Sequence, residues 1–187
     1  MDFRENWINF LHRAATGTKK TRTLLTPIGV VIFGIFTVSF VIIAIIIDRL
    51  LNLPSFLLEE LRIPLSVLVL LSGIIVTAWS VFHFVKVKGT PVPINPPPQV
   101  VKTGPYRYAR NPMLTGVFLL LFGIGFGVNS FSLVFIFTPL FMVINVWELK
   151  KIEEPELIKR LGKEYIVYKN QTPMFFPRLK PKKKQRA

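Results

Sequence analysis

The sequence predicts an all-helical integral membrane protein with about four transmembrane helices, and three uncharged runs carry this prediction. The chain has 187 residues, of which 51% are hydrophobic, and residues 23–47, 63–85 and 111–147 contain no Asp, Glu, Lys or Arg. A nearly uncharged apolar run of about 18 or more residues is typical of a membrane span. Because lipid offers the backbone no hydrogen-bond partners, such a run is expected to be helical. The runs exclude a soluble domain and a disordered chain, and the absence of cysteine excludes disulfides and thiolate chemistry.

The first two runs each predict one span, over residues 24–47 and 63–85. The third run has 37 residues and would reach roughly 55 Å as one helix, whereas the hydrocarbon core of a bilayer is about 30 Å thick. Residues 123–130, near its middle, are rich in glycine and end in Asn-Ser, which is typical of a turn. We therefore expect a helical hairpin with spans over residues 113–126 and 130–147.

Two segments are expected to lie against the membrane surface. Residues 3–15 place Phe3, Trp7 and Phe10 at helical spacing, but they carry charges and are too few to cross a bilayer. The tail 178–187 is strongly basic. Each Lys or Arg near an anionic leaflet contributes about 1 kcal/mol to binding, so anionic lipid is the expected partner of this tail.

The charged residues indicate how the spans are oriented. Residues 1–23 contain five Lys and Arg, residues 86–110 contain five with no acid, and residues 148–187 contain twelve. The loop 48–62 contains only two, together with three acids. Since Lys and Arg favour the cytoplasmic side of a membrane, both termini and the 86–110 loop are predicted to be cytoplasmic.

Two segments outside the spans are expected to hold the functional site. The loop 86–112 contains five prolines between residues 91 and 98, which favour extended backbone. Residues 153–177 follow the last span, and Pro155 is expected to interrupt the helix there and to begin a new one. The apolar positions of that helix recur at helical spacing and predict one amphipathic stripe, made of Leu157, Leu161, Tyr165 and Tyr168.

The charged side chains of these two segments suit a small cationic or zwitterionic ligand. Arg107 and Arg110 can neutralise a carboxylate or phosphate, and the neighbouring tyrosines can stack on a base or face a cation. Glu153 and Glu154 can neutralise an ammonium or sulfonium group. A solvated basic loop and an acidic helix N-terminus would give the same pattern. With two histidines, no cysteine and no H-E-x-x-H spacing, a metal site is not expected.

Two ordered motifs resemble one enzyme superfamily. Residues 104–116 read G-x-Y-x-x-x-R-N-P-x-x-x-G, similar to the G-x-Y-x-x-x-R-H-P-x-Y-x-G signature of the isoprenylcysteine carboxyl methyltransferase and phospholipid methyltransferase superfamily. Residues 153–168 read E-E-x-x-L-x-x-x-L-G-x-E-Y-x-x-Y, followed by Pro173 and Pro177, and resemble the C-terminal motif of the same superfamily. The similarity extends over residues 86–177, about half of the chain.

The resemblance implies an integral-membrane methyltransferase that uses S-adenosylmethionine. Glu153 matches an acid of the family's catalytic site, and Glu154 is the adjacent candidate. The acceptor is expected to be lipophilic and to enter from the bilayer, as a prenylcysteine carboxylate or a lipid head group would. The implied cofactor-binding residues are Gln99, Val100, Val101, Tyr106, Arg110, Asn111, Pro112, Met113 and Leu114.

Three positions depart from the family pattern. Asn111 stands where the family has His, and Leu114 stands where it has Tyr. Leu149 stands where the prenylcysteine enzymes have an Arg that handles the substrate carboxylate, which weighs against that acceptor. Two other functions remain open from the sequence: an NADPH-dependent membrane reductase of the sterol reductase type, and a non-enzymatic protein that binds anionic lipid.

Overall fold

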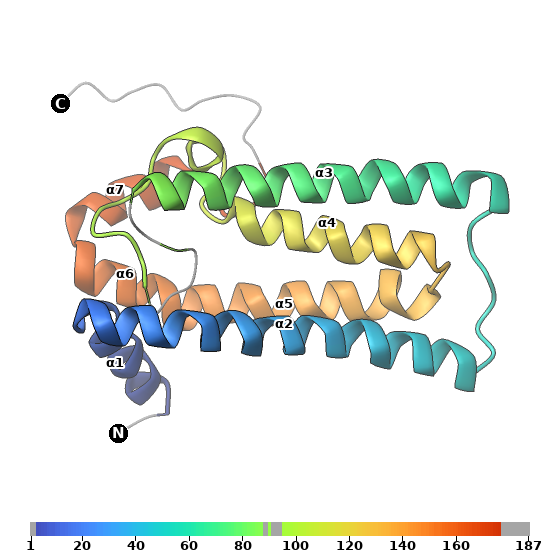
Figure 1. The fold of residues 1–187 in the computed structure, drawn as a ribbon, viewed down its shortest axis with the longest axis horizontal. Helices are drawn as coiled ribbons and strands as arrows, with labels where there is room; N and C mark the ends of the chain where they lie inside the picture. Colours follow the sequence, from blue (N-terminus) through green and yellow to red (C-terminus); the bar gives the residue numbers. More distant parts are fainter. Residues whose placement is uncertain (1–2, 88–89, 91–94, 177–187) are drawn as a thin grey trace.

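The computed structural model describes residues 3–87, 90 and 95–176, and these residues form an all-helical protein, as predicted (Figure 1). The basic tail 178–187 and the prolines at 91 and 93 lie outside the described residues. Three helical stretches are long and apolar enough to cross a membrane: Lys20–Leu50, Glu59–Lys86 and Leu133–Leu161. A shorter apolar helix covers Pro112–Gly127, close to the predicted third span.

The long helices lie side by side (Figure 1). In this view helices α4 (Pro112–Gly127) and α5 (Thr138–Glu148) lie between α3 (Glu59–Lys86) and α2 (Lys19–Leu50). Large apolar side chains of α2 and α3 are exposed along the outside of the bundle, where lipid tails would contact them. The interior is aromatic: Phe40 and Phe118 both pack edge-on against Phe141 of α5, which is fully buried.

Small residues allow α3 and α4 to pack at close range. The buried residues of α3 are Ser66, Gly73 and Ser80, which recur every seven residues. A Cβ added at Gly116 of α4 would lie 2.9 Å from the carbonyl oxygen of Gly73, and the Ser66 hydroxyl donates to the Gly123 carbonyl at 2.8 Å. Close backbone approach of this kind stabilises helix pairs in lipid, where burial of apolar area adds little.

The last long helix continues through Pro155, which corrects the expected interruption. Two π-helical turns, Leu133–Phe137 (η2) and Leu149–Glu153 (η3), occur in this stretch, and each directly precedes a turn that contains a proline, Pro139 or Pro155. A proline lacks the N–H that would bond four residues back, and the wider π turn accommodates that loss without ending the helix. The chain therefore enters α6 (Glu154–Leu161) without a break.

The single amphipathic helix expected after Pro155 is instead two helices. Helix α6 ends at Gly162, whose φ of 57° lies in the left-handed region that favours glycine, and α7 (Lys163–Gln171) follows. Helices α6 and α7, the 3₁₀ turn η1 (Gly104–Arg107) and the N-terminal helix α1 (Phe3–Thr16) gather at one end of the bundle (Figure 1). We call this the pocket end.

The opposite end, which we call the turn end, holds the α4–α5 turn and the connection from α2 to α3. Asp48 at the end of α2 accepts hydrogen bonds from the Ser130 hydroxyl and from the backbone N–H of Ser132, the latter at 2.9 Å. Asn129 accepts from the N–H groups of Phe56 and Leu57 and donates to the Leu57 carbonyl. These bonds join the two connections to each other.

Candidate active site

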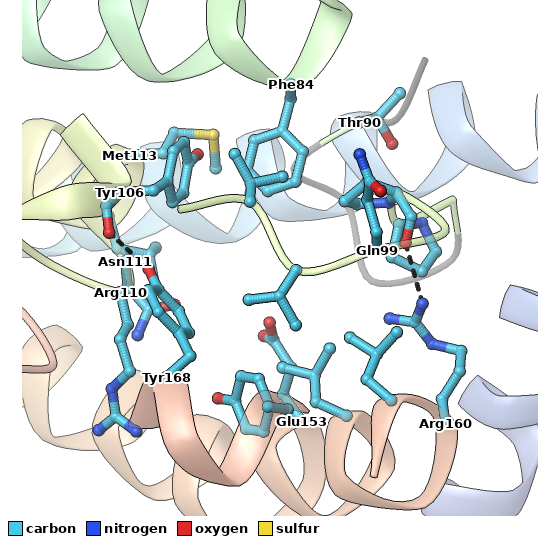
Figure 2. A pocket seen from close by; sticks show the side chains of 18 residues that line it. Phe84, Thr90, Gln99, Tyr106, Arg110, Asn111, Met113, Glu153, Arg160 and Tyr168 are labelled. Atoms are coloured by element: carbon cyan, nitrogen blue, oxygen red, sulfur yellow. Dashed lines mark hydrogen bonds between the residues drawn. The ribbon is translucent and has the colours of Figure 1, made fainter. Parts of the chain in front are cut away.

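A pocket opens between the segment before α4 and the helices after α5 (Figure 2). Its walls come from five parts of the chain: Phe84 of α3, Thr90, residues 96–101, residues 106–114, and the stretch from Glu153 to Tyr168. Nearly all of the predicted cofactor-binding residues line it: Gln99, Val100, Val101, Tyr106, Arg110, Asn111, Met113 and Leu114. The two segments that the sequence analysis singled out therefore form one cavity.

The turn at Gly104 sets the position of Tyr106, which lines the pocket. Gly104 has a φ of 57°, which favours glycine, and a Cβ there would lie 2.2 Å from Nε2 of His83, so a larger residue would strain the backbone and displace the His83 ring. The turn places Tyr106 edge-on to Phe84, with 4.7 Å between ring centroids. The Tyr168 hydroxyl of α7 donates to the Tyr106 carbonyl at 2.7 Å, which joins the two walls (Figure 2).

The segment after α7 closes against the start of α4. The backbone N–H of Arg110 donates to the Pro173 carbonyl at 2.8 Å, and that of Asn111 donates to the Met174 carbonyl at 3.0 Å. These N–H groups precede α4 and have no partner within that helix, so the C-terminal segment satisfies them. Pro112 begins α4 and is buried, away from the pocket lining.

The two predicted acids have different surroundings. Glu154 is buried and pairs with Arg110 at 2.9 Å and with Lys169 at 2.5 Å, so it neutralises the arginine of the signature. Glu153 lines the pocket and makes no hydrogen bond or ion pair within the described part of the chain. Of the two, Glu153 is therefore the carboxylate available to a ligand.

Three tyrosines contribute neutral walls. Burial raises the pKa of the Tyr106, Tyr165 and Tyr168 hydroxyls above the usual tyrosine value, so all three stay protonated at neutral pH. Their rings offer flat apolar faces to a ligand, and the pocket adds no anion from this side. By contrast Arg107 and Tyr108, which the sequence analysis also considered, are exposed and lie outside the lining.

Several lining residues were not predicted. Phe84 belongs to a span and resembles any other apolar residue there, and Pro96 and Pro97 were expected only as extended backbone. Arg160 also lines the pocket. It lies in the second motif between Leu157 and Leu161, two members of the predicted stripe that line the cavity. Its position three residues after Leu157, on the same side of the helix, was the available signal.

The sequence model of the family described as phospholipid methyltransferase matches residues 61–164. This match covers more than half of the chain and includes the signature that lines the pocket. The chain belongs to the phospholipid methyltransferase family. Family membership confirms the predicted superfamily and implies methyltransferase activity in a membrane, which agrees with the three helices long enough to span one. No curated protein and no solved structure matches the chain.

Proposed function

We propose that this phospholipid methyltransferase family member transfers a methyl group from S-adenosylmethionine to the polar head group of a membrane lipid. The observation that carries the proposal is Glu153, an unpaired carboxylate in a pocket whose signature arginine is already neutralised by Glu154. The site thus favours a positive group, and both a sulfonium donor and an amine acceptor present one. By the distribution of Lys and Arg, the pocket and both termini are proposed to face the cytoplasm.

The pocket has features that fit S-adenosylmethionine. Phe84 and Tyr106 give it aromatic surface suited to an adenine, and residues Gln99 to Val101 line the same pocket. Asn111 and Met113 lie at the start of α4, where the methionine half would bind. When bound, the cofactor supplies a methyl group already activated on a positive sulfur. The protein's part is to orient the reactants and to exclude water.

The surroundings of Leu149 favour a lipid head group over a prenylcysteine carboxylate. Leu149 is 2% exposed and packs in the apolar cluster with Phe118, Phe141 and Phe175, so no cation is available there to hold a carboxylate. Lys150 and Lys151, the nearest cations in the sequence, are exposed. An amine acceptor loses a proton as it gains the methyl group, and Glu153 is the pocket carboxylate that can accept it.

The pocket charges weigh against NADPH. A 2′-phosphate needs an unpaired cation, but Arg110 is paired with Glu154, Arg160 is paired with Glu156, and Arg107 lies outside the lining. The unpaired Glu153 would repel the phosphates of the dinucleotide.

Equilibrium binding to the detergent-solubilised protein tests the proposal. Radiolabelled S-adenosylmethionine is expected to bind saturably, and NADPH is not. Methyl transfer is then measured with an aminophospholipid and with a prenylcysteine analogue, and the aminophospholipid is expected to be the better acceptor. Binding of NADPH alone would indicate a reductase, and binding of neither ligand would refute the enzymatic function.

A further inference from the structure

Arg160 carries a hydrogen-bonding group that the described part of the chain leaves unused. Its side chain is only 10% exposed. Its Nε donates to Oε1 of Glu156 at 3.0 Å, and its Nη1 donates to the Pro97 carbonyl at 3.0 Å. Its Nη2 is buried and has no hydrogen-bond partner among the described residues. A buried donor without a partner is costly, so a partner is expected to arrive with a ligand.

The position of Arg160 indicates where that ligand would lie. The guanidinium lines the pocket on the side of Gln99, across the cavity from Arg110 and Asn111 (Figure 2). Arg160 is fixed through two of its nitrogens and keeps the third for the cavity. A guanidinium held in this manner is oriented before the ligand binds.

The N-terminal helix supports this arrangement from behind. Glu156 is buried, and its Oε1 lies 3.4 Å from Nδ1 of His12 on α1 as well as against Arg160. Lys159 donates to Oδ1 of Asn9 at 3.0 Å, which gives α1 a second contact with α6. Helix α1 therefore contacts the buried carboxylate that holds a pocket residue.

We propose that Arg160 is a ligand-binding residue, whose Nη2 donates a hydrogen bond to the nucleoside half of the methyl donor. Glu156 and His12 are positioning residues that act through Arg160. The identity of the ligand rests on the proposed function, which places the nucleoside beside Gln99. The acceptors on that half are the ring nitrogens of the base and the oxygens of the ribose. A bond to any of them would satisfy the unused donor.

Two ligands can show which half of the methyl donor Arg160 contacts. S-adenosylhomocysteine contains both halves, and 5′-methylthioadenosine contains the nucleoside without the amino acid. Calorimetric titration of the solubilised protein is expected to show that Arg160→Gln weakens both ligands by about tenfold, or about 1.4 kcal/mol. Arg62→Gln is the matched control, because Arg62 pairs with Glu59 at the turn end and is expected to leave both affinities unchanged.

Arg160→Lys is a second variant that controls for misfolding, because it keeps a positive charge beside Glu156 but lacks the planar guanidinium. It is expected to lower the affinity for both ligands, as Arg160→Gln does. Glu156→Gln and the half-buried His12→Gln test the positioning role. Each is expected to weaken both ligands when Arg160 is present and to add nothing to Arg160→Gln, since residues that act through one another are not additive.

The outcomes distinguish this inference from the proposed function. Weakening of S-adenosylhomocysteine alone would place Arg160 on the amino-acid half and overturn the assignment. Unchanged affinity for both ligands would remove Arg160 from the site altogether. Additive losses in the double variants would overturn the positioning role of Glu156 and His12. Failure of the unmodified protein to bind either ligand would refute the proposed function itself.

Discussion

Selected polar side chains at the two ends of the bundle differ in how their hydrogen bonds are made. At the turn end, Asp48 and Asn129 have their oxygens bonded to neighbouring hydroxyl and backbone groups, and the two connections are joined as a result. At the pocket end, Glu153 and Nη2 of Arg160 have no hydrogen bond among the described residues, although both lie at the cavity. Satisfied groups stabilise a fold, whereas unsatisfied groups beside a cavity indicate where a ligand contributes.

Membrane topology is the first test of this comparison, because the two ends are predicted to face opposite sides. The chain has no cysteine, so single cysteines can be introduced without background labelling. Ser55→Cys and Val128→Cys are expected to react with an impermeant reagent from one side, and Asn95→Cys from the other. Reaction of all three from the same side would contradict the topology.

At the turn end, Asp48→Ala is expected to reduce stability without affecting ligand binding. It removes a charged acceptor from two hydrogen bonds, and the expected loss is about 3 kcal/mol in the free energy of unfolding. Unfolding in mixed detergent measures the loss, and Asp48→Asn, which keeps one acceptor oxygen, is expected to lose less. A reduced affinity of the folded protein for S-adenosylhomocysteine would show that the ends are not independent.

At the pocket end, Glu153→Gln is expected to reduce activity without reducing stability. The change keeps the size of the side chain but removes its charge, so methyl transfer should fall by at least about tenfold, equivalent to about 1.4 kcal/mol in the barrier. Thermal stability in detergent should barely change, because Glu153 makes no hydrogen bond or ion pair across the described residues. Glu164→Gln is the control, since Glu164 forms an exposed pair with Lys102. Full activity of Glu153→Gln would leave Glu154 as the next candidate.

The smallest expected effect concerns the turn that supports the pocket. Gly104→Ala places a Cβ on a residue with a φ of 57° and against His83, and is expected to cost about 1 kcal/mol of stability from the backbone alone. Adding His83→Ala removes the contact and should recover ligand affinity, while the backbone cost remains. Thermal unfolding and S-adenosylhomocysteine titration of the single and double variants measure the two contributions. No recovery in the double variant would mean that the His83 contact is unimportant.

The sequence predicted the helices well where composition alone decides the structure. Uncharged apolar runs identify spans because lipid permits few alternatives, and α4 begins and ends within one residue of the expected 113–126. The passage through Pro155 was missed, because a proline usually ends a helix, whereas here the π turn Leu149–Glu153 precedes it and the helix continues. The division at Gly162 was visible in the sequence, but the regular apolar stripe on either side outweighed it.

The sequence predicted those pocket residues that belong to the two motifs or were implied by them, but it did not predict Arg160. The signature and the second motif indicated that Gln99, Tyr106 and Glu153 would share one pocket, and these residues line one cavity. Arg160 was missed because a Lys-Arg pair on an amphipathic helix usually faces water. Only the three-dimensional structure shows that Glu156 and the Pro97 carbonyl hold it inward.

The backbone bonds from Arg110 and Asn111 to Pro173 and Met174 also bear on how the protein is made. The two carbonyls belong to residues that the ribosome adds after every helix of the bundle has been synthesised. A nascent chain can therefore begin to insert its spans before the segment that accepts these two hydrogen bonds has been made. The order of synthesis thus allows membrane insertion to start before the C-terminal segment closes against α4.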